Sequence, residues 1–253
     1  MKVVILAGGR GTRLSEETHA IPKPMVRIGG RPIIWHIMSR YAAYGFDDFI
    51  VACGYKGEVL KEYFSRYRAN ESDIRVDLDT GSVELLSQPA KNWRVTLVDT
   101  GQDTKTGGRI KRLERFLDDT FMLTYGDGLA DIPIDALIEH HRVQRATATV
   151  TAVHPLPRWG ALSVEDERVV GFSEKPADPS SWVNGGYFVM EPEILDLLVD
   201  EPGLEQEPME TLAARRQLAA YRHDGFWMAM DTARDRDELN ELWDRGDAPW
   251  TAR

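Results

Sequence analysis

The sequence predicts an α/β protein built on a doubly wound mixed, mostly parallel sheet. Val3–Leu6 and Phe49–Cys53 are apolar runs without polar alternation, which is typical of strands buried on both faces of a sheet. Between them, apolar residues recur at helical spacing from Pro32 to Tyr41, and Gly45 suits the end of a helix. This strand–helix–strand order favours a right-handed crossover between parallel strands.

The remaining elements continue the alternation of strands and helices. The region Ile74–Val98 contains three short strand-like runs between polar turns, which suggests an extension at the sheet edge. His140 and His141 are expected on a solvated helix face. No repeat or linker divides the chain, so a single domain, residues 1–253, is expected. Further strands are predicted at Phe121–Thr124, Ala148–Val153, Ala161–Val164, Val169–Ser173 and Tyr187–Met190, and helices at about 54–67, Thr106–Phe116, Ile134–Arg142, Glu207–Arg216 and Ala233–Trp243.

The charge balance and the cysteine content exclude several classes of partner. The chain has 31 basic and 41 acidic residues and a net charge of −10, which makes it a poor general binder of nucleic acid. No stretch approaches the ~20 apolar residues of a membrane helix, and the N-terminal apolar run is too short for a signal-peptide core. Cys53 is the only cysteine, which fits a reducing compartment. We therefore expect a cytoplasmic protein without a nucleic-acid or membrane partner.

The glycine-rich segment Leu6–Leu14 is the first candidate site. It follows a predicted strand, and its glycines allow backbone N–H groups to form a cradle for an anion. Arg10 and Arg13 add positive charge, and Lys23 follows between two prolines that stiffen the backbone. Three cations beside such a loop favour a triphosphate ligand, whereas the alternative is an ordinary β-turn with surface charges.

Two other phosphate-binding loops do not fit this segment. A Rossmann dinucleotide site has a third glycine where Leu14 stands here, and an acidic residue at the end of the second strand, where Cys53 and Gly54 stand. A Walker loop requires a Gly-Lys-Ser/Thr sequence, which does not follow these glycines. The segment therefore predicts a nucleotide site of another kind.

Two aspartates are candidate ligands of Mg²⁺. Asp127 lies between two glycines at the carboxyl end of a predicted strand, where open α/β sheets bind ligands, and a carboxylate there can hold Mg²⁺ on a phosphate. Asp231 directly precedes the last predicted helix. The alternatives are a turn aspartate at position 127 and helix capping at position 231, although Thr232 could cap instead while Asp231 points elsewhere.

Two polar segments are candidate substrate contacts. Glu174, Lys175, Asn184 and Gly185 supply a carboxylate, an ammonium group and an amide near glycine, a set that can hold sugar hydroxyls and a sugar phosphate. The alternative is a pair of loops with solvated charges. The Gly-rich stretch Asp99–Arg109 leads into a helix and is either a nucleotide-contacting loop or a flexible surface loop.

Together these motifs resemble the sugar nucleotidyltransferase superfamily, whose hallmark is similar to Leu6–Leu14 followed by Pro22–Met25. Within it the chain resembles the glucose-1-phosphate cytidylyltransferases. Trp159 stands where that family has Phe, and residues 176–182 match none of its motifs, so the sugar is less firmly implied than the reaction. The matching motifs cover nearly the whole chain: Glu16–Thr18, Trp35–Met38, Cys53–Gly57, Val98–Gly101, Thr106–Arg109, Thr124–Gly128, Glu205–Pro208, Gly225–Trp227 and Ala248–Trp250.

The resemblance implies a Rossmann-like nucleotidyltransferase fold, with a nucleotide-binding part at about residues 1–130 and a sugar-binding part, with a small C-terminal lobe, at about 131–253. It implies transfer of a cytidylyl group from CTP to α-D-glucose 1-phosphate, with Mg²⁺ as cofactor, CDP-glucose and pyrophosphate as products, and a homo-oligomer, for example a hexamer. The implied nucleotide contacts are Leu6, Ala7, Gly8, Gly9, Gly11, Thr12, Arg13, Lys23, Thr104, Arg109 and Gly126. The implied sugar-phosphate contacts are Tyr125, Gly160, Glu174, Lys175, Asn184 and Gly185, the metal ligands are Asp127 and Asp231, and the catalytic residues are Arg13, Lys23 and Asp127.

Two alternatives remain open from the sequence. The first keeps the chemistry but uses another nucleotide or phosphorylated acceptor, because the choice of base depends on a few hydrogen bonds. The second is a non-catalytic nucleotide-binding subunit. Arg13, Lys23, Asp127 and Asp231 argue against it, because a subunit that only binds nucleotide has no need of metal carboxylates.

Overall fold

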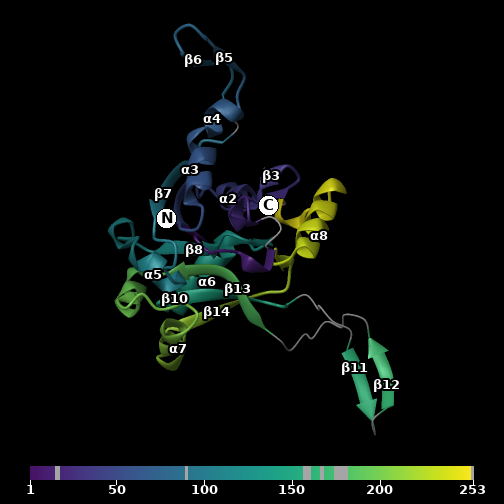
Figure 1. Ribbon diagram of the computed structural model, residues 1–253. Helices are drawn as coiled ribbons and strands as arrows, with labels where there is room; N and C mark the ends of the chain where they lie inside the picture. Colours follow the sequence, from purple (N-terminus) through teal and green to yellow (C-terminus); the bar gives the residue numbers. More distant parts are fainter. Residues whose placement is uncertain (15–17, 89–90, 156–160, 166–167, 174–181, 252–253) are drawn as a thin grey trace.

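The core of the protein is a seven-stranded sheet. The structure, a computed structural model, describes residues 1–14, 18–88, 91–155, 161–165, 168–173 and 182–251, without the side chains of residues 13 and 161–173. The strand order is β14-β10-β13-β8-β1-β4-β7 (Figure 1). The strands are β1 Val3–Ala7, β4 Asp48–Cys53, β7 Arg94–Asp99, β8 Phe121–Tyr125, β10 Ala148–Val153, β13 Val183–Met190 and β14 Leu218–His223.

One strand of this sheet, β13, runs against the other six. It pairs antiparallel with β8 and β10, whereas the remaining neighbours pair parallel. The predicted mixed, mostly parallel sheet is therefore confirmed. Because β13 is reversed, its first residues lie at the same edge of the sheet as the last residues of β8.

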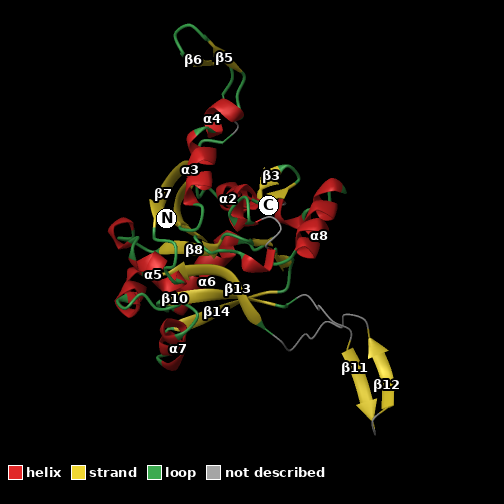
Figure 2. Ribbon diagram, viewed as in Figure 1, coloured by secondary structure: helices red, strands yellow, loops and turns green. Residues whose placement is uncertain are grey.

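Helices cover both faces of the sheet (Figure 2). The side chains of β1 alternate between two cores: Val3 and Ile5 pack in the core that contains residues of α2, α3, α6 and α8, and Val4 and Leu6 in the core that contains residues of α5, η4 and α7. This explains the continuous apolar run of β1. None of the helices in the described ranges is long and apolar enough to cross a membrane. The helices are α2 Ile33–Ala43, α3 Gly57–Ser65, α4 Tyr67–Asn70, α5 Thr106–Lys111, α6 Ile134–Gln144, α7 Glu207–Ala214 and α8 Ala233–Asp244, with 3-10 turns η1 Thr12–Leu14, η2 Lys23–Met25, η3 Glu114–Phe116, η4 Pro192–Leu198 and η5 Pro249–Thr251.

Short antiparallel pairs lie outside the main sheet. The hairpin of β5 Ile74–Val76 and β6 Val83–Leu85 extends beyond α4, away from the sheet (Figure 1). The region Ile74–Val98 was expected at the sheet edge, and its last strand, β7, pairs with β4 as the edge strand of the main sheet. The other pairs are β2 Arg27–Ile28 with β3 Arg31–Pro32, β9 Gly128–Ala130 with β15 Trp227–Ala229, and β11 Ala161–Glu165 with β12 Arg168–Ser173.

Two predicted elements differ clearly from the structure in their bounds, and one strand of the main sheet was not predicted. Strand β13 begins at Val183 rather than Tyr187, because Val183 and Asn184 still pair with Val153 and Ala152 of β10, beyond the register shift at which the two glycines lie. The predicted helix Thr106–Phe116 ends at Lys111 and continues only as the 3-10 turn η3. Strand β14 was not predicted because Leu218–His223 is a half-exposed edge strand without a continuous apolar run.

Candidate active site

A cleft of about 530 Å³ lies at the carboxyl ends of β1 and β8. The glycine-rich loop after β1 and the segment that enters α5 both line it. Most of the predicted site residues meet here: Leu6, Ala7, Gly8, Gly9, Gly11, Thr12, Lys23, Thr104, Arg109, Tyr125, Gly126, Asp127 and Asp231. This position is where open α/β sheets bind their ligands.

The glycines of the cleft are required by close packing behind the loop. A Cβ at Gly8 would overlap the guanidinium of Arg109. Gly11 has a φ of +60°, which favours glycine, and a Cβ at Gly126 would lie 2.9 Å from the carbonyl oxygen of Leu6. Gly9 differs, because no atom of the described residues lies within 4 Å of the position that a Cβ would take there, so their packing does not require glycine at this position.

Arg109 is a buried clamp behind the glycine-rich loop. Its guanidinium donates to the carbonyl oxygens of Gly8 at 3.0 Å, Gly101 at 2.7 Å and Gln102 at 3.1 Å. It also donates to Thr100 Oγ1 at 2.9 Å and to the carbonyl oxygen of Cys53 at 3.3 Å. Burial, followed by the neighbouring charge of Arg112, lowers the pKa of Arg109.

The clamp joins three strand ends. Gly8 follows β1, Cys53 ends β4, and Thr100 follows β7, so one planar side chain holds all three in register at the cleft. Arg109 lines the cleft as predicted. Its hydrogen bonds go to the protein, however, and they hold the glycine-rich loop in shape.

Asp127 and Asp231 converge although 104 positions separate them. Strand β9 follows Asp127, strand β15 precedes Asp231, and the two strands pair with Gly128 opposite Ala229. The amide of Met230 also donates to the carbonyl oxygen of Asp127 at 2.9 Å. This pairing sets both carboxylates at the cleft.

Lys23 lies between these carboxylates. Its Nζ is 2.6 Å from Asp127 Oδ2 and 2.8 Å from Asp231 Oδ1, and its side chain is 11% exposed. Burial alone lowers the pKa of Lys23, but the two carboxylates outweigh burial, so the pKa is raised and the ammonium stays charged.

The helix-capping alternative for Asp231 is wrong. The capping box of α8 is formed by Thr232 and Asp235: the amide of Asp235 donates to Thr232 Oγ1 at 3.3 Å, and Asp235 Oδ2 accepts from the amide of Thr232 at 2.7 Å. The carboxylate of Asp231 therefore does not cap α8, and it contacts Lys23 in the cleft.

The two aspartates fit a Mg²⁺ site shared with a phosphate ligand. Their oxygens already face one cation, the Lys23 ammonium. Among the described residues no third Asp, Glu, His or Cys joins them. Mg²⁺ bound to nucleotides characteristically takes one or two protein carboxylates and completes its octahedron with phosphate oxygens and water.

Tyr125 connects the cleft to the reversed strand β13. Its hydroxyl donates to Glu205 Oε1 at 2.6 Å and accepts from Asn184 Nδ2 at 3.3 Å. Burial, followed by the charge of Glu205, raises the pKa of Tyr125, so the phenol remains a neutral donor. The carbonyl oxygen of Gly185 accepts from Trp227 Nε1 at 2.7 Å, which ties β13 to β15.

Asn184 and Gly185 therefore lie next to the cleft in strand β13, not in a loop as the alternative to substrate contact supposed. Gly160, Glu174 and Lys175 lie outside the described residues, as does the side chain of Arg13, whose backbone is in η1. Arg10, a predicted source of positive charge, forms an ion pair with Asp103 at 2.8 Å.

Four cleft residues were not among the predicted contacts: Pro24, Lys105, Thr106 and Glu205. Glu205 is the most informative of them. Its Oε2 accepts from Thr106 Oγ1 at 2.7 Å while its Oε1 accepts from Tyr125, so it bridges two walls of the cleft. Thr106 and Glu205 both lie in motifs on which the family resemblance rested. Those motifs were the feature of the sequence that could have identified the two residues as cleft residues.

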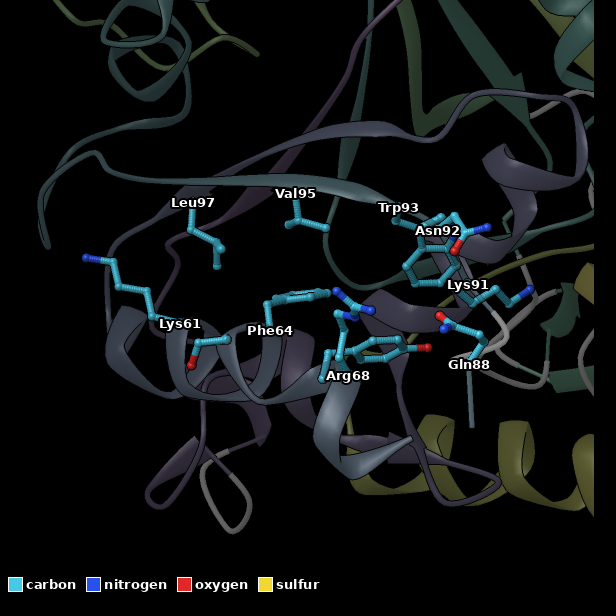
Figure 3. Close-up of a pocket in the computed structure, with 11 residues that line it drawn as sticks. Lys61, Phe64, Arg68, Gln88, Lys91, Asn92, Trp93, Val95 and Leu97 are labelled. Atoms are coloured by element: carbon cyan, nitrogen blue, oxygen red, sulfur yellow. The ribbon is translucent and has the colours of Figure 1, made fainter. Parts of the chain in front are cut away.

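A second cavity, of about 740 Å³, lies between α3, α4 and β7 (Figure 3). Phe64 and Lys61 of α3 line it opposite Val95 and Leu97 of β7. The described residues that line it include no carboxylate and none of the residues of the first cleft.

Known proteins resemble this chain in sequence and in fold. The family model described as nucleotidyl transferase matches residues 2–245. Glucose-1-phosphate cytidylyltransferase of Salmonella typhi is 49% identical over 253 residues, which cover 99% of this chain and 98% of that protein. Mannose-1-phosphate guanyltransferase of Yarrowia lipolytica is 32% identical over 244 residues, which cover 93% of this chain and 62% of that protein.

Solved structures show the same fold at lower sequence identity. A UDP-glucose pyrophosphorylase complexed with UDP-glucose has a TM-score of 0.70 and 19% identity, with 97% of this chain and 98% of that chain covered. HddC from Yersinia pseudotuberculosis has a TM-score of 0.68 and 22% identity, with 96% and 99% covered. At such identities the likeness concerns the fold alone.

Proposed function

Because the chain belongs to the nucleotidyl transferase family, we propose that it transfers a cytidylyl group from CTP to α-D-glucose 1-phosphate and releases pyrophosphate. The relatives named glucose-1-phosphate cytidylyltransferase support this reaction, since 49% identity extends over almost the whole of both chains. The product is CDP-glucose.

The observation that carries the proposal is the position of Lys23, Asp127 and Asp231 beside a glycine-rich loop. The ammonium of Lys23 lies within hydrogen-bond distance of both carboxylates, in a cleft at the carboxyl ends of β1 and β8. Polyphosphate transfer needs this combination, because the loop leaves room for phosphates and the charges stabilise them. A module that only binds nucleotide has no need of the carboxylate pair.

The reaction is an in-line substitution at the α-phosphorus of CTP. An oxygen of the glucose 1-phosphate phosphate group forms the new P–O bond as the bond between the α-phosphorus and the bridging oxygen to the β-phosphate breaks, and pyrophosphate leaves with that electron pair. The protein's task is to position two anions and to stabilise the developing charge, and no covalent enzyme intermediate is needed.

Individual residues have separate tasks in this proposal. The loop from Leu6 to Thr12 holds the nucleotide, and Lys23 and Arg13 stabilise charge on the transferring and leaving groups. Asp127 and Asp231 hold Mg²⁺, which when bound neutralises phosphate oxygens as a Lewis acid. The separation of Lys23 from water supports its role, since a charge acts more strongly in a site of low exposure.

The acceptor side is proposed from the residues next to Tyr125. Asn184 and Gly185, with Gly160, Glu174 and Lys175, contact glucose 1-phosphate. Tyr125 supports this arrangement because its hydroxyl joins Asn184 to the cleft. We further propose that the enzyme works in the cytoplasm as a homo-oligomer and that it needs neither nucleic acid nor membrane.

Pyrophosphate release with Mg²⁺ tests the reaction. CTP, UTP, dTTP, ATP and GTP are each combined with glucose 1-phosphate, mannose 1-phosphate and galactose 1-phosphate. Turnover confined to CTP with glucose 1-phosphate supports the proposal. Turnover with GTP and mannose 1-phosphate, the pair in the name of the 32% identical relative, would keep the chemistry and change the substrates. No turnover with any pair, together with micromolar nucleotide binding, would favour the non-catalytic alternative.

A further inference from the structure

Lys23 occupies the point at which the two proposed metal ligands meet. Its Nζ is the partner of Asp127 Oδ2 and of Asp231 Oδ1, at 2.6 and 2.8 Å. We infer that Lys23 is the counter-cation of the metal site in the free enzyme, so that Mg²⁺ enters efficiently only with a nucleotide whose phosphates draw the ammonium away. This inference rests on the proposed function and adds a coupling between metal and nucleotide binding.

Two adjacent carboxylates need a cation in the absence of metal. The side chains of Asp127 and Asp231 are only 30% and 21% exposed, so water screens their mutual repulsion incompletely. The ammonium of Lys23 removes most of this repulsion and donates one charge-assisted hydrogen bond to each carboxylate. The free site is therefore stable without a divalent ion.

The same arrangement opposes binding of a metal alone. Mg²⁺ contacts carboxylate oxygens at about 2.1 Å, closer than an ammonium nitrogen does, so the two cations compete for the same oxygens. Mutual repulsion also prevents Lys23 from remaining between the aspartates beside a divalent ion. A metal that arrives without nucleotide must separate Lys23 from both carboxylates and offers the ammonium no new partner.

A nucleotide supplies that new partner. Lys23 Cβ and Cδ lie 3.1 and 3.6 Å from the position that a Cβ on Gly11 would occupy, so the lysine stem runs along the glycine-rich loop. The backbone of Lys23 is held between Pro22 and Pro24 in η2, which leaves the flexible end of the side chain as the part that moves. A phosphate chain on the loop is then within reach of the ammonium.

The coupling predicts the behaviour of a variant without the ammonium. In Lys23→Met the carboxylates lose their internal cation while the length of the side chain is kept. We expect the affinity for Mn²⁺ alone, in the absence of nucleotide, to rise about tenfold or more, the usual range for coupling between sites. Mn²⁺ is measured by electron paramagnetic resonance, which reports the free ion directly.

A matched control removes one positive charge from the same cleft. Lys105 lines the cleft and has no ion pair with Asp127 or Asp231 in the described part of the chain. Lys105→Met should change Mn²⁺ affinity less than threefold, and Lys23→Met with Asp127→Asn should lose the gain. Equal effects of the two lysine variants would reduce the inference to general electrostatics and overturn it.

Separate measurements distinguish the coupling between metal and nucleotide from the folding of the variants and from the proposed reaction. Lys23→Gln serves as a second variant, and thermal melting establishes that each variant is folded. An unchanged or weaker Mn²⁺ affinity in both folded Lys23 variants overturns the inference, even if the wild type turns over CTP. Tighter Mn²⁺ binding in a protein that fails the substrate panel would keep the inference about this site and reject the proposed reaction.

Discussion

Arg109 Nη2 donates a hydrogen bond to the carbonyl oxygen of Gly8 at 3.0 Å. This bond connects the start of the glycine-rich loop to a guanidinium that also holds Cys53, the last residue of β4, and Gly101, which follows β7. The glycine-rich loop is therefore held in shape by the protein itself, and much of its order depends on a side chain 101 positions away in the sequence.

Arg109→Lys should disorder the loop without removing its charge. A lysine cannot reproduce the planar fork, so several buried carbonyl oxygens lose their donors. We expect the free energy of unfolding to fall by about 3 kcal/mol and kcat/KM for CTP to fall at least tenfold. Urea unfolding and steady-state kinetics measure the two effects. Arg115→Lys, at an exposed position on η3, is the control, and equal behaviour of the two variants would contradict the clamp.

Gly8→Ala should affect stability, whereas Gly9→Ala should affect the binding of CTP. A methyl group at Gly8 would collide with Arg109, so the variant should lose about 1–3 kcal/mol of stability without any ligand. A methyl group at Gly9 meets no protein atom, so the stability should change by less than about 0.5 kcal/mol while the KM for CTP rises. Thermal melting and CTP kinetics test the pair, and a Gly9→Ala enzyme with normal KM would remove Gly9 from the nucleotide site.

Asp127→Asn and Asp231→Asn should each reduce kcat about a hundredfold or more while the fold is retained. Each change removes one of the two carboxylates available to Mg²⁺ and leaves Lys23 one partner. Pyrophosphate release over a Mg²⁺ titration measures the effect, and circular dichroism checks the fold. Asp118→Asn, at an exposed aspartate outside the cleft, should behave as wild type. Near-normal kcat in either cleft variant would reject the metal assignment.

His36 should make stability depend on pH. Burial lowers the pKa of His36, and its ring accepts from Trp250 Nε1 at Nδ1 (3.2 Å), while Nε2 lies 2.8 Å from the carbonyl oxygen of Ile28. The neutral ring satisfies both contacts, whereas a second proton would oppose the Trp250 donor. The folded pKa therefore lies below the unfolded value of about 6.5, and the unfolded chain binds the proton first as pH falls.

The stability that depends on neutral His36 is fully present above about pH 6.5 and is lost as the pH falls through the folded pKa. The slope is at most about 1.4 kcal/mol per pH unit. His36→Gln keeps a donor and an acceptor but does not titrate. Urea unfolding from pH 7.5 to 5.5 should show a steeper loss in the wild type than in this variant. Parallel curves would show that His36 does not contribute to the pH dependence of stability.

Local patterns in the sequence were enough to predict the central strands and the glycine-rich loop. Val3–Leu6 is apolar at every position because both faces of β1 are covered, and this can be recognised without the structure. The glycines and Lys23 identified the cleft for a similar reason, since a phosphate site needs close backbone approach and positive charge in a short segment.

His141 shows where local patterns in the sequence fail to predict burial. It was expected to face solvent, and the structure buries it, with Nδ1 2.8 Å from Thr149 Oγ1 and Nε2 3.0 Å from Glu191 Oε1. Its helix α6 is amphipathic only weakly in sequence, so the face that turns inward depends on β10 and on the residue after β13. Neither Thr149 nor Glu191 belongs to helix α6.

The amino-acid sequence alone therefore established the types of residue available: buried strands, a flexible glycine loop, one lysine between prolines and two aspartates at the ends of elements. Tertiary structure established that Lys23, Asp127 and Asp231 share one point, and that Arg109 faces the protein. The physical reason is that backbone preference and burial are local properties, whereas the meeting of charges depends on the register of β9 with β15, strands about 100 residues apart. Only the folded chain brings those charges close enough to act together.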